Sequence, residues 1–331
     1  MNTRVSRGIA GDIVVAMQAL QQLPESLVIS VLSECRQSLP EQLSFLPPAL
    51  HVAAIHAAFP SIYAQRSLTL NSQVAGSAAV ASVLPYIGNF TGLRTLIVRV
   101  HFLDSDVVNA LRPSVGKLAG TLQHLVLDFR ACGFAGPLSP DPRELSPQVR
   151  HDRSTVAICG AQALSQYLAT FTCIMELRVE AQGIRAEGVR ALAPALAQIS
   201  NLQYLILEDN DLGVDGATAL AAHLSSLVSL THLNLAINDL GAKGVAVLAP
   251  QLGKLTALAH LMMAANDLCA EGAVALGPQL AKLIGLKHLN IADNEIKSDG
   301  IAALAPHLTH LTGLRALHIA CLLYTSDAAD E

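Results

Sequence analysis

The chain has 331 residues, of which 52% are hydrophobic and 14% charged, and its formal net charge is −5. Nucleic acids and anionic membranes need clustered positive charge, and the chain has no dense run of lysine and arginine, so neither is expected as the main partner. The longest uncharged stretches, 43–60 and 74–93, are broken by proline and glycine and lack the run of about 20 apolar residues that a membrane span requires. Asp12 interrupts the apolar segment that a signal peptide would need, so we expect an unsecreted, cytoplasmic protein.

Motifs for catalysis and cofactor binding give no positive signal. The patterns GxxxxGK, GxSxG, HExxH and GxGxxG do not occur. The six cysteines show neither a CxxC pair nor a regular spacing, which favours reduced thiols over a disulfide framework or a metal site. We therefore expect a protein that is not an enzyme and that binds no cofactor.

Residues 1–64 precede any repeating pattern. They predict short helices at 13–20, 27–35 and 50–59, separated by prolines. An irregular helical segment before a repeat array usually covers the core of the first unit, so a helical N-terminal capping segment is expected. A second interpretation stays open, because LPESLVISVL (23–32) resembles the start of an F-box, the motif that docks onto a ubiquitin-ligase adaptor. That resemblance implies a substrate adaptor.

A regular repeat occupies residues 65–320. Twenty-eight residues separate the first positions of its clearest phrases, which are Ile174, Leu202, Leu230, Leu258, Leu286 and Leu314. Weaker copies begin at 65, 93 and 122. A fixed period of this length is typical of a solenoid, in which each unit buries its apolar side only against its neighbours.

One unit, 230–257, illustrates the expected local structure. Leu230, Leu233 and Leu235 predict a short strand with its leucines inward and the intervening residues outward. Gly244 predicts a tight turn into a helix, whose apolar stripe recurs with helical spacing through Leu255. Between strand and helix comes an asparagine that both donates and accepts hydrogen bonds. We expect it to form a buried structural ladder that pairs the backbone groups at the turn, made of Asn210, Asn238, Asn266 and Asn294.

Two segments depart from the period. Ile174 follows Leu122 by 52 residues, so 24 residues are extra, and we expect a proline-rich insertion loop at about 134–156. The tail, 321–331, leaves the pattern in mid-strand and resembles the conceptual translation of a sequencing adapter. We expect this tail to be an artefact and the natural protein to continue beyond Ala320.

The phrase LxxLxLxxNxLxxxG, followed by a helix rich in alanine and leucine, resembles the ribonuclease-inhibitor type of leucine-rich repeat. The resemblance implies an α/β fold: a right-handed horseshoe solenoid with a parallel β-sheet on the concave face and helices on the convex face. It also implies a non-catalytic scaffold that binds a protein partner on the concave strands. Ran GTPase-activating proteins use the same repeat type, so a regulator of a small GTPase is the alternative.

Outward positions of the strands are therefore the candidate protein-binding residues. Exposed Tyr, Ile and Met beside polar groups are typical of interface centres. The candidates are Glu176, Arg178, Glu180, Tyr204, Ile206, Glu208, His232, Asn234, His260, Met262, His288 and Asn290.

Three of these candidates, His232, His260 and His288, form a column in adjacent units, and His124 occupies the same slot of its own phrase. Neighbouring rings about 5 Å apart could share a zinc ion. Rings in identical rotamers point the same way, however, and no cysteine or carboxylate in that slot completes a closed site, so no metal is predicted. A weaker hypothesis is that protonation of the column alters partner binding at mildly acid pH.

Overall fold

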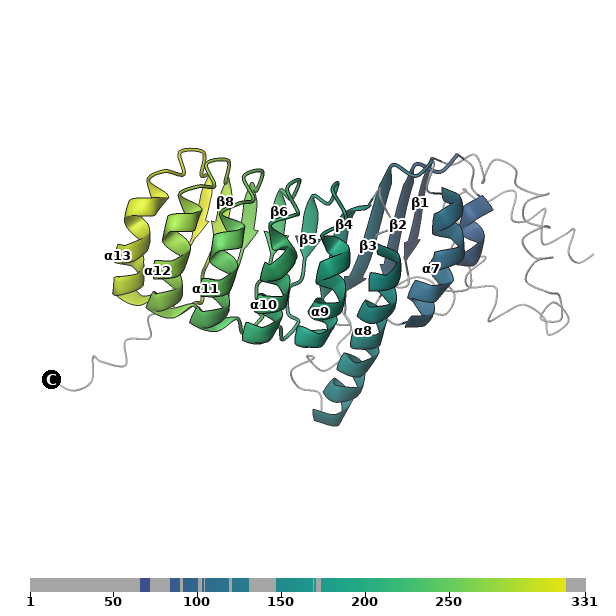
Figure 1. The fold of residues 1–331 in the computed structure, drawn as a ribbon, viewed down its shortest axis with the longest axis horizontal. Coiled ribbons are helices and arrows are strands. Elements are labelled where there is room, and N and C mark those ends of the chain that lie inside the picture. The colour runs from purple at the N-terminus through teal and green to yellow at the C-terminus, as the bar shows by residue number, and fades with distance from the viewer. Residues whose placement is uncertain are drawn as a thin grey trace, which may run out of the picture.

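The computed structural model describes residues 66–71, 84–89, 92–100, 103, 105–118, 121–130, 147–168, 170 and 174–319. Strands and helices alternate along this part of the chain (Figure 1). The strands are β1 (Ser67–Asn71), β2 (Thr95–Val100), β3 (His124–Arg130), β4 (Ile174–Glu180), β5 (Tyr204–Ile206), β6 (His232–Asn234), β7 (His260–Met262), β8 (His288–Asn290) and β9 (Ala316–His318). The helices are the 3-10 helix η1 (Leu84–Asn89) and α7 (Ser105–Leu118), α8 (Pro147–Leu168), α9 (Arg185–Leu196), α10 (Gly213–Leu224), α11 (Gly241–Leu252), α12 (Cys269–Leu280) and α13 (Lys297–Leu308).

The strands form one parallel sheet whose spatial order is the order of the chain, from β1 to β9. Equivalent positions of successive units lie side by side, as Leu205, Leu233 and Leu261 do. The helices of the described ranges all lie on one face of this sheet, and none of them lies on the other (Figure 1). The expected α/β solenoid with a parallel sheet is confirmed. We call the sheet face opposite the helices the open face.

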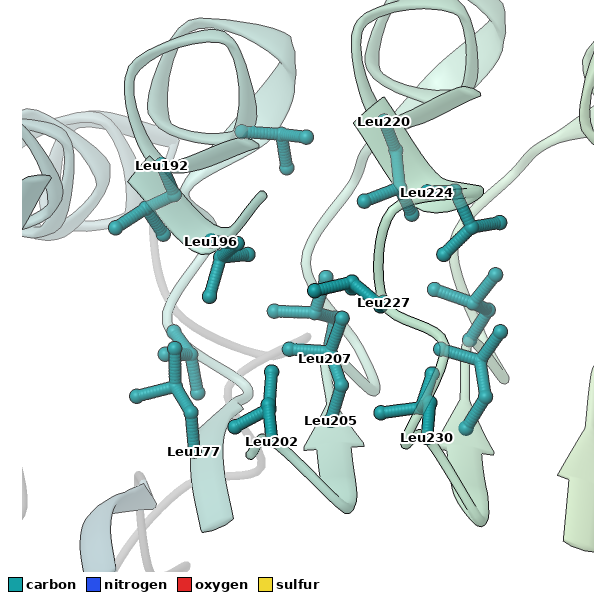
Figure 2. Close-up of a cluster of buried hydrophobic side chains, with 14 of the residues drawn as sticks. Leu177, Leu192, Leu196, Leu202, Leu205, Leu207, Leu220, Leu224, Leu227 and Leu230 are labelled. Carbon is teal, nitrogen blue, oxygen red and sulfur yellow. The ribbon is translucent and has the colours of Figure 1, made fainter. Parts of the chain in front are cut away.

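The core lies between the sheet and the helices (Figure 2). Alternation along each strand turns one set of leucines toward the helices, and Leu205, Leu207 and Leu233 are at most 1% exposed. Helical spacing brings Leu220 and Leu224 of α10 onto the same layer, where they are also buried. Because each helix packs on the next helix along the chain, the apolar layer is continuous from unit to unit.

A ladder of asparagines runs through the strand-to-helix turns. Asn210, Asn238, Asn266 and Asn294 are each 0% exposed. The backbone N–H of each of the first three donates to the Oδ1 atom of the next, at 3.0, 3.1 and 2.8 Å. Each Nδ2 donates to a backbone carbonyl of the preceding unit, within its strand or directly after it, and these acceptors are Val179, Leu207, Leu235 and Met263, at 2.6–2.8 Å. The ladder therefore joins neighbouring units through polar groups that have no access to water.

Gln182 extends this ladder by one unit, which the sequence analysis did not predict. It lies 28 residues before Asn210 and is 6% exposed. Its backbone N–H donates to Asn210 Oδ1 at 3.2 Å, and its Oε1 accepts from the N–H of Leu103 at 3.0 Å. The longer side chain reaches a backbone group 79 residues upstream. A glutamine at the asparagine position was the signal that could have revealed this link.

The buried glycines near the start of each helix, predicted as tight turns, allow close packing between units. A Cβ atom added to Gly244 would lie 3.1 Å from Ala217 Cβ and 3.5 Å from Val214 Cα, both on the preceding helix. Gly244 itself has no positive φ, so the constraint is space rather than backbone conformation. Glycine at this position brings neighbouring helices together.

The first residue of each of the last five helices does have a positive φ. Gly213 and Gly241 adopt φ of +59° and +62°, while Lys297 at the same position adopts +56°. A left-handed conformation costs a non-glycine residue about 1–2 kcal/mol, partly offset by the larger chain entropy that glycine loses on folding. Replacing Lys297 by glycine is therefore expected to raise the free energy of unfolding by about 0.5–1 kcal/mol, measured by urea denaturation. The reverse change, Gly241→Ala, should lower the free energy of unfolding by a similar amount. Two variants that are both as stable as the unmodified protein would contradict the argument.

Helix α8 begins earlier than the sequence suggested. Residues 147–156, expected to belong to the insertion loop, form the first part of this 22-residue helix. Pro147 is its first residue, where the missing N–H breaks no helical hydrogen bond. The rest of the expected loop, 134–146, lies outside the described residues, as do the expected capping segment 1–64 and the tail 321–331. Among the helices that are described, none combines the length and apolar character needed to cross a membrane.

Candidate functional site

The open face collects the predicted binding residues from five consecutive strands, β4 to β8. Positions that alternate with the buried leucines carry them. Glu180 is the last residue of β4, and Glu208 lies two residues beyond the end of β5. Most are half-buried, while Met262 is 38% exposed and Asn234 is 7% exposed. The structure thus brings together on one surface the twelve side chains that were predicted from their positions in the repeat.

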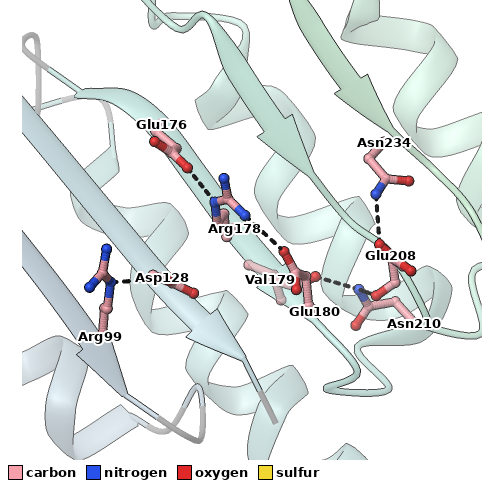
Figure 3. A network of polar contacts seen from close by, with 9 residues as sticks. All are labelled: Arg99, Asp128, Glu176, Arg178, Val179, Glu180, Glu208, Asn210 and Asn234. Atoms are coloured by element: carbon pink, nitrogen blue, oxygen red, sulfur yellow. Dashed lines mark hydrogen bonds and ion pairs between the residues drawn. The ribbon is translucent and has the colours of Figure 1, made fainter. Parts of the chain in front are cut away.

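Charged residues on the β2–β5 part of the open face contact one another (Figure 3). The Arg178 guanidinium donates from Nε to Glu176 and lies 3.5 Å from Glu180 Oε1 through Nη1. Glu208 Oε2 accepts from Asn234 Nδ2 at 2.7 Å. These contacts hold the carboxylates of β4 and β5 in fixed positions beside the rings described below.

Arg99 and Asp128 also belong to this network and were absent from the predicted set. Arg99 Nε lies 3.5 Å from Asp128 Oδ2, and Asp128 is in register with both Arg99 and Arg178. Asp128 is 3% exposed. The early phrases lack the asparagine, so the sequence analysis did not extend the binding face to β2 and β3. The period of their leucines was the available signal.

Four aromatic rings form a stack across the open face. The centroid distances are 4.1 Å from Tyr204 to His232, 4.0 Å from His232 to His260 and 4.3 Å from His260 to His288. The interplanar angles are 21°, 11° and 8°. The strands place these four residues in register, so the rings face their neighbours. We call this set of residues the ring stack.

Thr231 contacts the ring of His232. The Thr231 hydroxyl lies 3.1 Å from the carbonyl oxygen of Gln203 and 2.9 Å from His232 Nδ1. The hydrogen bond between the hydroxyl and Nδ1 orients the ring within the ring stack.

Burial lowers the pKa of His232 to about 4, with further lowering by the charges of His260, His288 and Arg178. Burial also lowers the pKa of His260, as do His288 and Lys287. Both rings are therefore neutral at pH 7, because both pKa values lie below the ordinary value of 6.5. Neutral rings avoid mutual repulsion and stack at close distance.

These shifts make stability depend on pH. The folded protein binds a proton at His232 less tightly than the unfolded chain, so acid favours unfolding. The stabilising contribution is complete above pH 6.5 and is lost as pH falls toward the folded pKa of about 4. We expect the free energy of unfolding, measured by urea denaturation, to decrease from pH 7 to pH 4.5, and to decrease less in His232→Gln. His310→Gln changes an exposed residue outside the ring stack and should show the same decrease with pH as the unmodified protein. If His232→Gln also showed that same decrease, the lowered pKa of His232 would be disproved.

His124 does not join the ring stack, which corrects the sequence-based alignment. The register shifts between Leu125 and Val126, so Val126 pairs with Glu176. His124 contacts Met175 instead. Within the ranges that the structure describes, no group of three or more His, Cys, Asp or Glu side chains is arranged to hold a metal ion.

Comparison with protein families connects the fold to a class. Residues 198–221, 226–249 and 286–305 match the family model described as Leucine Rich repeat. These three segments are leucine-rich repeats. The matched segments include β5, β6 and β8 with parts of the helices that follow them. Three ring-stack residues, Tyr204, His232 and His288, therefore lie within matched segments. No curated protein matches the chain.

The leucine-rich repeats explain the shape of the candidate site. Because each repeat contributes one short strand, the open face grows by one row of outward side chains per repeat. The site is therefore a broad surface rather than an enclosed pocket, which suits a macromolecular partner better than a small molecule.

Proposed function

We propose that the protein is a non-catalytic scaffold that binds a protein partner on the open face. Leucine-rich repeats are generally protein-interaction modules, which supports the proposal. The observation that carries it is the continuous row of partly exposed Tyr and His side chains on β5 to β8, beside a second row in which Ile206 and Met262 alternate with asparagines. Such a mixture is typical of the centre of a protein interface.

We further assign the repeats to the ribonuclease-inhibitor type. One helix of 12 residues follows each of the strands β4 to β8, and the buried asparagines recur at one position of the repeat. Both features agree with the sequence phrase that suggested this type. The proposed site comprises the twelve residues on β4 to β8, and no catalytic group, cofactor or metal takes part in it.

Site-directed crosslinking tests the location of the binding surface. A photoreactive amino acid at Ile206 or Met262 is expected to crosslink a partner from a cell extract, whereas the same group at Val247 or Val274 on the helices should not. Val247 and Val274 are 40% and 57% exposed, so they are matched controls for accessibility. Crosslinking from the helical positions alone would contradict the proposal.

A purified partner then allows a quantitative test. Met262→Glu is expected to weaken binding by about 2 kcal/mol, roughly 30-fold, because it replaces the most exposed apolar side chain of the surface by a charge that the partner would have to desolvate. Val247→Glu should leave the affinity unchanged, as measured by calorimetry.

The two alternative functions predict different results. A regulator of a small GTPase would accelerate GTP hydrolysis in a single-turnover assay with candidate GTPases, and such stimulation would replace the scaffold proposal. An F-box adaptor would bind a ubiquitin-ligase adaptor protein through residues 20–60, which deletion of that segment would abolish.

A further inference from the structure

The ring stack ends abruptly on β9. Tyr204, His232, His260 and His288 occupy the same position of four successive strands, and Ala316 occupies that position on the fifth. Ala316 is half-buried and has only a methyl group to offer. Within the described residues, the ring of His288 therefore stacks on one side only.

The position beside His288, above Ala316, corresponds to one strand of the sheet, and each of the strands β5 to β8 contributes one ring to the stack. Adjacent strands lie about 4.8 Å apart, and the rings of the stack follow one another at 4.0–4.3 Å. A ring placed above Ala316 would thus meet the uncovered side of His288 at the same distance. We call this space, bounded by His288 and Ala316, the terminal slot.

The other end of the stack offers no comparable space. Glu176 is in register with Tyr204, and its carboxylate accepts from Arg178. A charged and hydrogen-bonded pair therefore occupies the row beside Tyr204. Only the end at β9 combines a ring surface with a small neighbour.

Two positively charged residues lie beside the terminal slot, at the start of its two strands. Lys287 and Arg315 directly precede β8 and β9, are both exposed, and are joined by a hydrogen bond from Arg315 N to Lys287 O of 2.7 Å. The Lys287 charge acts on the stack itself, since it helps to lower the pKa of His260. A cationic ligand is disfavoured here, and a ring flanked by carboxylates is complementary.

We propose that the terminal slot binds a tryptophan or tyrosine side chain from an acidic segment of a protein partner, which continues the stack as a fifth ring. The inference rests on the proposed function and specifies the chemistry of the partner. Stacked aromatic pairs contribute beyond the area they bury, and aromatic side chains are favoured anchors in interfaces.

Short peptides test the chemistry directly. The protein contains no tryptophan, so the fluorescence of the tryptophan in acetyl-Glu-Trp-Glu-amide reports binding without background. We expect quenching that saturates. Acetyl-Lys-Trp-Lys-amide should bind more weakly, and the difference should shrink at high salt. Acetyl-Glu-Leu-Glu-amide, used as a competitor, should be roughly three- to tenfold weaker because it lacks the ring.

Two substitutions locate the bound ring. Ala316→His supplies the fifth ring from the protein itself and is expected to abolish quenching by acetyl-Glu-Trp-Glu-amide, whereas Ala316→Ser leaves the slot open and should preserve it. His288→Ala removes the stacking surface and should also abolish the quenching. This variant locates the bound ring if Ala316→His does not fold. Full binding by folded Ala316→His and His288→Ala, or no binding by the unmodified protein, would overturn the proposal. Crosslinking from Ile206 and Met262 would persist in that case if only the slot, and not the proposed function, is wrong.

Discussion

Replacing Asn238 by leucine is expected to destabilise the protein strongly, because Asn238 belongs to the buried asparagine ladder. The Oδ1 atom of Asn238 accepts from the N–H of Asn210, and its Nδ2 donates to the carbonyls of Leu207, Leu235 and Ala236. Leucine leaves the N–H of Asn210 and the carbonyl of Leu207 unpaired at a site with 0% exposure. The carbonyls of Leu235 and Ala236 keep their other donors, Asn266 Nδ2 and the N–H of Asp209. Each buried group without a partner costs about 1–3 kcal/mol, so the loss should exceed that of an ordinary core substitution.

Urea denaturation of Asn238→Leu, followed by circular dichroism, measures this loss. Asn290→Leu is the matched control, because Asn290 is half-buried and bonds one backbone group, the N–H of Ala292, at 3.1 Å. Water can reach that group, so the control should lose no more than about 1 kcal/mol. Equal losses in the two variants would show that the ladder does not stabilise the solenoid.

A second large effect is expected at Gly160 in α8. A Cβ atom there would overlap the carbonyl oxygen of Leu103 and lie 2.7 Å from its carbonyl carbon. The obstacle is backbone, which cannot rotate away as a side chain can. Gly160→Ala must therefore push α8 from its neighbour, and overpacking of this kind costs about 1–3 kcal/mol or more.

Gly116→Ala is a control for which the opposite change in stability is expected. Gly116 lies in α7, and a Cβ atom added to it meets nothing within 4 Å. Alanine favours helix over glycine by about 1 kcal/mol, so Gly116→Ala should raise the melting temperature while Gly160→Ala lowers it. Thermal melts of the two variants would contradict the packing argument if both moved in the same direction.

The repeat from Ile174 onward was predictable because periodic leucines leave few alternatives. Leu205, Leu233 and Leu261 must face one core, and their equal spacing places them side by side in successive strands. The open-face position of Tyr204 and His232 then follows from strand alternation. The earlier units were harder, because β3 and β4 are separated by a long insertion that leaves their relative register undetermined.

The alignment of His124 shows the limit of such reasoning. Its phrase has the same leucine spacing as the others, yet the register shift at Leu125 and Val126 places Val126 beside Glu176. Hydrogen bonding between strands, not the phrase, decides which residues become neighbours. The start of α8 at Pro147 was mistaken for loop for a different reason. Proline and mixed charge suggested a loop, but they are also compatible with the first turn of a helix.

The sequence alone determined the solenoid, the alternation of inward and outward residues, and the column of His232, His260 and His288, because these depend on spacing along the chain. Only the tertiary structure decided that the rings stack with Tyr204, that the Gln182 side chain bonds the N–H of Leu103, and that the ring of His288 stacks on one side. Those features depend on rotamers and on contacts between segments distant in sequence. The spacing of residues along the chain does not determine either.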